Sequence, residues 1–420
     1  MSKLTNFKGL CGVCRGGVAC MQRKRRVFDT CHSFMRPSLV QYVQLPENGG
    51  WLLQKSRAPV QTLENLEMKK TLVALAALAS VSAFAQSSVT LYGQFDAGIY
   101  NIKKANGTDS ATVYGDGAIF SNILGFKGTE DIGGGLKAGF DFQTDVQTNN
   151  GGLNQNGLFR RQANGNIAGN FGEVKLGLTT NPIIATNSAL MPTGANGNSV
   201  STTTSSAMGY SDFYTKNAVT YTSPAFYGVT AQIQRGMSNN IESSSAGSVS
   251  AYSLAYVNGP LEVRYAAQDR KAAAAGAANS GANPSTAADA AVAKESSVFG
   301  AKYAIGQWSV AAARLKTQKA GSAEVTGNQA GVAYTTGAWT LGGALTKSEG
   351  SKLTIAQARY ALSKRTNLIG LYGIADNAAT VKFSPVAFNT GNSPATITDT
   401  YTGTANTKQT AIGLGLTHSF

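Results

Sequence analysis

Side chains able to catalyse a reaction are scarce in this chain. It has two histidines among 420 residues, and only His418 lies beyond residue 85. Residues 86–420 contain no G-x-S-x-G nucleophile elbow, no H-E-x-x-H zinc motif and no glycine-rich phosphate-binding motif. We therefore expect no enzymatic activity and no cofactor.

All four cysteines lie near the N-terminus, at Cys11, Cys14, Cys20 and Cys31. With His32 they could form a small zinc module, but structural zinc sites usually use two separated ligand pairs, and only one C-x-x-C pair occurs here. We expect no metal site. The basic run 23–26 in the same region could bind nucleic acid, but an exposed charge run in unstructured chain is the simpler interpretation. We expect no nucleic-acid partner.

Four charged residues farther along could perform a different kind of chemistry. Lys127, Arg161 and Lys175 fall on the polar face of segments with strand-like alternation, and Asp212 lies in a polar segment between two of them. Fixed charges that line a narrow aqueous path favour ions of the opposite sign. The alternative is that each is an ordinary solvated charge at a rim.

Such charges would have to be positioned by β-strands, and the last strand is the clearest. Every second residue from Ile412 to Phe420 is large, whereas the residues between them are small or polar. A period of two predicts a strand. One apolar and one polar face suit either a soluble sandwich or a transmembrane barrel, in which lipid lies outside and water inside.

Alternation of this kind recurs in about 16 segments, a number found in barrels that enclose an aqueous channel. The first covers 89–100 and the second 117–130, and short turns alternate with long polar segments at 181–215, 271–295 and 376–407. No apolar run after Ala85 is long enough for a transmembrane helix, so a membrane-spanning chain must be a closed barrel. The sequence thus predicts an all-β fold, a 16-stranded antiparallel transmembrane β-barrel.

Two smaller expectations follow from this arrangement. Asp96 would face water in the lumen, where a carboxylate costs little. Tyr100, Trp308 and Trp339 stand at strand ends and would belong to the aromatic girdles at the membrane surfaces, although ordinary loop packing is the alternative.

The N-terminal region has the layout of an exported protein. Met68-Lys69-Lys70, an apolar run and the A-x-A sequence ending at Ala85 predict a signal peptide at 68–85, with cleavage between Ala85 and Gln86. The alternative is a buried Ala/Leu helix. We interpret residues 1–67 as an upstream extension from a mis-assigned start, and residues 86–420 as the barrel. Lys and Arg are concentrated before residue 86, so the net charge of +14 overstates that of the barrel.

Several blocks resemble general diffusion porins of the neisserial and Burkholderia type. They are Ser88–Gly93 (S-V-T-L-Y-G), Leu124–Ala138 (with G-F-K-G-T-E-D), Leu158–Ala163 (L-F-R-R-Q-A), Phe171–Gly177 (F-G-E-V-K-L-G) and the final T-H-S-F. The resemblance covers essentially all of 86–420. It implies a water-filled passive channel for small hydrophilic solutes and ions in the outer membrane of a Gram-negative bacterium. It further implies a homotrimer embedded in outer-membrane lipid, with the third extracellular loop folded inward.

The resemblance also bears on individual residues. It implies that Arg161 belongs to the basic wall of the constriction and that Phe420, which ends the closing strand, is recognised by the barrel-assembly machinery. Ile123 and Leu178 stand where the family commonly has arginines, and the third loop holds one carboxylate, Asp212. Two rival functions remain: a substrate-specific outer-membrane channel, and a barrel that serves mainly as an adhesin anchor.

Overall fold

The computed structural model describes residues 88–420, except 105–106, 118, 154–156, 193–206, 209, 211–212, 239–244, 272–292, 320 and 387–402. All of these belong to one compact unit, Ala76–Phe420. The expectations for the extension 1–67, the signal peptide 68–85, the cleavage site at Ala85 and Gln86, and the loop carboxylate Asp212 lie outside the described residues.

The described chain consists of strands and one short helix, α2 (Pro182–Ala189). The strands are β1 (Ser88–Lys103), β2 (Ala111–Asp116), β3 (Ile123–Gly133), β4 (Leu136–Asp145), β5 (Gln162–Gly169), β6 (Gly172–Thr180), β7 (Tyr214–Thr222), β8 (Val229–Gly236), β9 (Val249–Asn258), β10 (Leu261–Arg270), β11 (Ala293–Ile305), β12 (Trp308–Lys319), β13 (Glu324–Thr336), β14 (Trp339–Ser348), β15 (Ser351–Ala361), β16 (Thr366–Asp376) and β17 (Lys408–Ser419). Among the described residues, no helix has the length and apolar character needed to cross a membrane.

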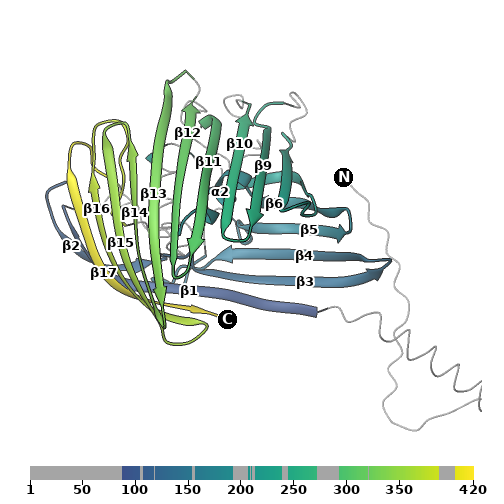
Figure 1. The fold of residues 1–420 in the computed structure, drawn as a ribbon, viewed down its shortest axis with the longest axis horizontal. Coiled ribbons are helices and arrows are strands. Elements are labelled where there is room, and N and C mark those ends of the chain that lie inside the picture. Colours follow the sequence, from purple (N-terminus) through teal and green to yellow (C-terminus); the bar gives the residue numbers. More distant parts are fainter. Residues whose placement is uncertain are drawn as a thin grey trace, which may run out of the picture. The chain divides into compact units, whose positions relative to one another are not determined.

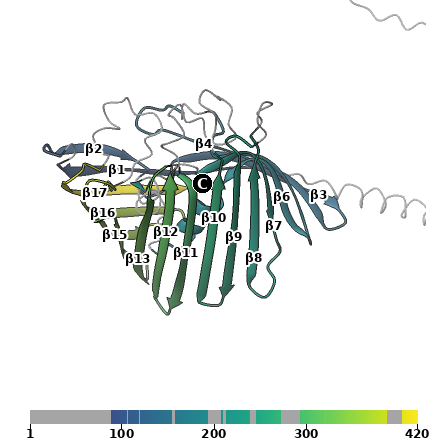
Figure 2. The ribbon, with the colours of Figure 1, turned by 90° about the horizontal axis from the view of Figure 1, so that it is seen from above.

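The strands form a closed antiparallel barrel. From β3 to β17 each strand pairs with the next along the chain, and the ordered series β6 to β13 can be followed in Figure 2. The ring closes where the last strand, yellow in Figure 1, lies beside the first: Asp96 pairs with Thr417 and Lys103 with Thr410. A closed sheet has no edge strand with unpaired backbone N–H and C=O groups. A protein that crosses lipid with β-strands requires such closure.

The seventeen named strands make sixteen barrel positions, because β2 and β3 share one. β1 pairs with β2 through residues 97–102 and with β3 through residues 88–94. The predicted 16-stranded antiparallel barrel is thereby confirmed. The single second strand expected at 117–130 is wrong, since strand structure covers 111–116 and 123–133 and the chain leaves the sheet between them.

Apolar residues alternate outward along the strands. On β17 the side chains of Ile412 and Leu414 are 59% and 75% exposed, whereas their neighbour Ala411 is buried. Near the short turns the outer face carries two cross-strand aromatic pairs, Trp308 with Tyr334 at 4.6 Å and Trp339 with Tyr360 at 4.8 Å between ring centroids. These pairs are the interfacial aromatics expected at one edge of a membrane-spanning band.

Tyr100 is not one of them, and its assignment to a girdle is wrong. Its ring points inward and is 1% exposed. It packs where a side chain at Gly413 would otherwise stand: a Cβ added there would lie 2.0 Å from the ring. The glycine on the closing strand thus makes room for an aromatic on the first strand.

Asp96 also differs from expectation, because it does not face open water. Its carboxylate is 1% exposed and accepts hydrogen bonds from the amides of Ile119, at 2.8 Å, and Phe120, at 2.6 Å. The chain between β2 and β3 therefore folds over the inner wall and solvates this carboxylate with backbone N–H groups.

A second inward segment was not expected. Residues 377–386, which follow β16, place Val381, Phe383 and Val386 in a buried cluster with inward-facing apolar residues. Their partners on β15 and β16 are Leu353, Ile355, Ile369 and Leu371. The inner wall is consequently not polar throughout: on this side it is covered by apolar packing, which narrows the interior.

Candidate functional site: the constriction and its charged wall

The long connection between β6 and β7, residues 181–213, carries α2 and is called the constriction loop below. Asn181 begins it as the N-cap of α2: its Oδ1 accepts a hydrogen bond from the amide of Ile183 at 3.0 Å, and Pro182 occupies the first turn. The amide Nδ2 of Asn181 donates to Thr215, at 3.1 Å, and to Gln268 on β10. One buried side chain thus fixes both the helix start and its attachment to the wall.

The far end of α2 is held by a lysine from the barrel. The helix has no basic residue in its last turn, but Lys302 on β11 donates from Nζ to the carbonyl oxygen of Ala189 at 2.6 Å. A cation stabilises a helix C-terminus, because the last carbonyl groups there lack helical hydrogen-bond partners. Lys302 also pairs with Glu262 at 2.6 Å, and Glu262 in turn pairs with Arg264.

Other described residues of the loop lie against β11, β12 and β13. Thr317 Oγ1 donates to the carbonyl of Met208 at 2.7 Å. Gly331 lets the loop approach closely, because a Cβ there would lie 2.9 Å from Pro192 Cδ. These contacts lie on the inner face of the wall, so the described part of the constriction loop lies inside the barrel.

The wall formed by β3 to β6 carries the charges that the sequence singled out. Asp145 at the end of β4 is buried and receives two arginines: Arg161 Nη1 lies 2.8 Å from Oδ1, and Arg160 Nε pairs with Oδ2. The arginine side chains remain about one-fifth exposed, at 19% and 22%. Two cations share one anion, so the cluster retains a net positive charge.

Arg161 is held in a fixed geometry on three sides. Besides Asp145, its Nε donates to Gln143 Oε1 at 2.9 Å, and its guanidinium carbon lies 5.3 Å from the centre of the Tyr214 ring. Burial by itself lowers the pKa of Arg161, but the neighbouring Tyr214 and Asp145 outweigh it and leave that pKa raised. Arg161 is therefore permanently charged. Its neighbour Tyr214 is the first residue of β7 and directly follows the constriction loop.

Lys127 and Lys175 lie on the same inner wall but have other surroundings. Lys127 on β3 is exposed, lies 5.1 Å from the centre of the Tyr92 ring and stands opposite Asp141 in the strand register. Lys175 on β6 pairs with Glu173 at 3.2 Å, with both side chains about one-third exposed. Each lysine thus has a carboxylate beside it, which reduces its field in the lumen.

The structure therefore places three of the four predicted lining charges on one inner wall, and Asp212 lies outside the described residues. Sequence reasoning missed Asp145, Arg160 and Lys302. The adjacent arginines at 160 and 161 were a usable signal, since one carboxylate can hold both. Nothing local in the sequence indicates that Lys302 reaches a helix end 113 positions away.

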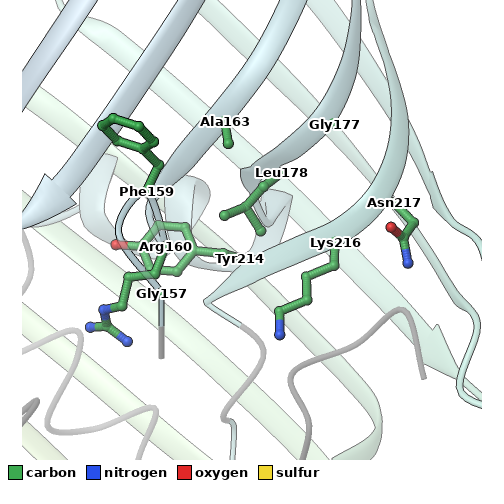
Figure 3. A pocket seen from close by; sticks show the side chains of 9 residues that line it. All are labelled: Gly157, Phe159, Arg160, Ala163, Gly177, Leu178, Tyr214, Lys216 and Asn217. Carbon is green, nitrogen blue, oxygen red and sulfur yellow. The ribbon is translucent and has the colours of Figure 1, made fainter. Parts of the chain in front are cut away.

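A hollow of about 480 Å³ lies near this cluster but is not the channel (Figure 3). Phe159, Ala163 and Leu178 form its apolar part, and Arg160 and Lys216 lie toward the loops. Ala163 stands opposite Phe142, which is exposed on the outer face, and Leu178 stands opposite Ala163. Figure 3 shows the helical ribbon behind the strands that carry these side chains. Leu178 therefore lines the outside of the wall.

Comparisons with known proteins agree with this geometry. The sequence model of a family described as Gram-negative porin matches residues 71–380. Outer membrane porin protein 32 of Delftia acidovorans is 34% identical over 221 residues, which are 50% of this chain and 62% of that protein. Major outer membrane protein P.IB of Neisseria gonorrhoeae is 31% identical over 209 residues, 47% of this chain and 56% of that protein. The chain thus spans about three-fifths of the length of these relatives.

Solved structures show the same fold at lower identity. An anion-selective porin from Comamonas acidovorans matches with a TM-score of 0.60 at 23% identity, over 80% of this chain and 100% of that chain. The trimer form of OmpT from Vibrio cholerae matches with a TM-score of 0.53 at 12% identity, over 80% of this chain and 99% of that chain. At these identities the likeness establishes the barrel fold.

Proposed function

Because this chain belongs to the Gram-negative porin family, we propose that its barrel is a water-filled channel for passive diffusion of small hydrophilic solutes and ions across the outer membrane. The observation that carries the proposal is the inward constriction loop, which lies against β10 to β13 while a charged wall remains on β3 to β6. A pore selects by its width and by the charges along it. No catalytic step is needed for this function.

The balance of fixed charges supports a weak preference for anions. On the β3 to β6 wall, four cations (Lys127, Arg160, Arg161 and Lys175) stand beside three carboxylates (Asp141, Asp145 and Glu173). Among the described residues near the other side, Glu262 lies between Arg264 and Lys302. Both groups have one more positive than negative charge, so the field is positive but small.

Flux measurements test the channel directly. Liposomes that contain the purified protein should swell in small sugars, and the rate should fall smoothly as sugar size increases, because a general pore discriminates by size. A substrate-specific channel would swell with one solute class far above others of equal size, and an adhesin with a closed barrel would not swell at all. Heat-unfolded protein reconstituted in the same way is the control.

The assembly partners form part of the same proposal. We infer a homotrimer in outer-membrane lipid, inserted by the barrel-assembly machinery, with Phe420 as the assembly signal at the end of β17. The trimeric form of the OmpT neighbour supports the oligomer.

For the region before the barrel, we retain cleavage between Ala85 and Gln86, since the basic, apolar and A-x-A regions occur in the order of a signal peptide.

A further inference from the structure

A row of three basic residues and one asparagine crosses the outer wall of the barrel at the end opposite the short turns. Arg314 on β12 stands opposite Asn328 on β13, Asn328 opposite Lys347 on β14, and Lys347 opposite Lys352 on β15. All four side chains are exposed, and the residues that flank Lys347 and Lys352 along their strands are buried, so the row points away from the lumen. We call these four residues the outer basic row.

The row lies at one edge of the apolar band. Trp339, in the aromatic pair near the short turns, precedes Lys347 by eight residues on the same strand. Eight residues span about 27 Å along a strand, and a tilt of about 40° reduces this to about 20 Å along the membrane normal. An apolar band about 25 Å tall therefore has the aromatics near one border and the outer basic row near the other.

Lys347 and Lys352 are the unusual members of the row. They face each other directly across a hairpin that is closed by two residues, Glu349 and Gly350. Directly opposite side chains have Cβ atoms about 5 Å apart, and like charges at that distance destabilise a sheet. Within the described part of the chain, neither lysine makes a side-chain hydrogen bond or an ion pair. A bound anion between the two ammonium groups would remove this repulsion.

The carboxylates at this level do not neutralise the pair. Glu324 is engaged with Lys316 at 2.9 Å, Glu349 in the hairpin turn accepts from the amide of Thr326 at 3.5 Å, and Asp376 stands opposite Lys352 without an ion pair at 4 Å or less. Asn328 adds an amide donor between Arg314 and Lys347. The row therefore offers several N–H donors and a net positive charge at a membrane border, which is the chemistry that recognises a lipid phosphate.

We propose that the outer basic row binds a phosphate group of an outer-leaflet lipid, with Lys347 and Lys352 as its two principal ligands. The proposal rests on the outer-membrane barrel described above, because only a lipid-facing wall brings headgroups to this level. The site is distinct from the channel, so it adds a lipid contact without changing the solute path.

The test measures binding of fluorescent bisphosphorylated lipid A to the folded full chain in detergent, by microscale thermophoresis. Each lysine near an anionic lipid surface contributes about 1 kcal/mol, so removing both charges in Lys347→Gln/Lys352→Gln should weaken binding about thirtyfold. Lys347→Arg/Lys352→Arg should retain most of the affinity. The matched control Lys364→Gln/Arg365→Gln removes the same charge at a short turn and should bind like the wild type.

Three results would overturn the proposal. The first is equal affinity of the Gln double variant and the wild type while both show normal heat-modifiable migration. The second is equal binding of lipid A from which both phosphates have been removed. The third is a change of oligomeric state in the double variant with lipid binding unchanged, which would assign the row to a protein contact. Conductance of the same variants should equal that of the wild type, so a failure of the channel proposal would be seen separately.

Discussion

Arg161 shows how a single residue can set ion preference without acting alone. Its side chain is about one-fifth exposed, and Arg161 and Arg160 both pair with Asp145. At about 8 Å in a water-like medium, one unit charge acts on a passing ion with roughly 0.5 kcal/mol. Removing it should therefore change selectivity measurably but modestly.

We predict that Arg161→Gln lowers the anion-to-cation permeability ratio by roughly fivefold, because the charge attracts an anion and repels a cation by about this energy each. The measurement is the reversal potential of single channels in a salt gradient at low ionic strength. The shift should fade as salt rises, since the screening length is about 8 Å at physiological salt. Lys364→Gln, in a short turn, is the control.

The opposite shift is expected for Asp145→Asn, because it removes the carboxylate that both arginines share. Coincident reversal potentials for the wild type, Arg161→Gln and Asp145→Asn at low salt would show that selectivity is determined elsewhere in the pore.

At the residue scale the sequence allowed only part of this cluster to be predicted. Alternation indicates which face a residue occupies, and this was enough for Lys127, Arg161 and Lys175. It does not indicate partners, because Asp145 ends β4 whereas Arg161 directly precedes β5, on the other side of a long connection. Asp96 was misjudged because it lies under the segment between β2 and β3, whose path no local pattern reveals. Tyr100 was misjudged because its ring packs against Gly413 on the closing strand, a partner distant in the sequence.

Among the elements, the constriction loop is held in position more by its contacts with the barrel wall than by the stability of its own helix. α2 has eight residues, too few to be stable alone in water. Its position comes from Asn181 at the start and Lys302 at the end. The loop's rigidity should consequently be adjustable from the barrel wall.

We predict that Lys302→Met increases open-channel current noise and lowers the voltage at which the pore closes. A hydrogen bond to a charged group contributes about 1.5–3 kcal/mol, and its loss frees the carbonyl of Ala189 and the end of α2. Planar-bilayer recordings measure both quantities. Lys316→Met, on the outer face of the neighbouring β12, removes a lysine that pairs with Glu324 and touches none of the described loop residues, so it should behave as the wild type. Equal noise in the two variants would refute the attachment.

Phe420 follows the last strand and also bonds to the first strand, so it helps to close the barrel. Its amide donates to the carbonyl of Gly93 and its carbonyl accepts from the amide of Gly93, both at 3.1 Å. The ring lies where a side chain at Gly93 would stand, since a Cβ there would be 2.3 Å from the ring. Assembly and seam closure are therefore two separable roles for one residue.

We predict that deleting Phe420 lowers the yield of heat-modifiable trimer and increases degradation in the periplasm, while channels that do assemble conduct normally. Phe420→Ala keeps the backbone bonds to Gly93 and removes only the ring, and Phe420→Tyr keeps an aromatic ring. Loss of yield in Phe420→Ala but not in Phe420→Tyr would identify the ring as the assembly signal. A normal trimer yield after deletion would contradict both roles.

Element positions were more predictable than element ends. The period of two located the strands because lipid-facing and lumen-facing residues must alternate. It could not show that the chain leaves the sheet between β2 and β3, or that residues 377–386 fold onto apolar residues inside the barrel. Both segments are polar or irregular in sequence, and their positions depend on walls distant in the chain.

For the whole molecule, the described barrel begins with its first strand. β1 begins at Ser88, which pairs with Thr129, and β1 and β17 close the ring. Cleavage between Ala85 and Gln86 would therefore leave every strand of the described barrel in the mature chain. The A-x-A rule requires small residues at positions 83 and 85, and both are alanine here.

We predict that the protein recovered from outer membranes begins at Gln86. Mass spectrometry of the intact chain and of its peptides should show no sequence from residues 1–67, because neither the extension nor the signal peptide reaches the membrane. Ala85→Arg should block cleavage and accumulate a precursor in the inner membrane, since the peptidase site needs a small side chain. Lys104→Arg, a change in the connection after β1, should be processed normally. Repeated recovery of peptides that contain Cys11 or Cys31 from the outer-membrane fraction would show that the extension is part of the mature chain.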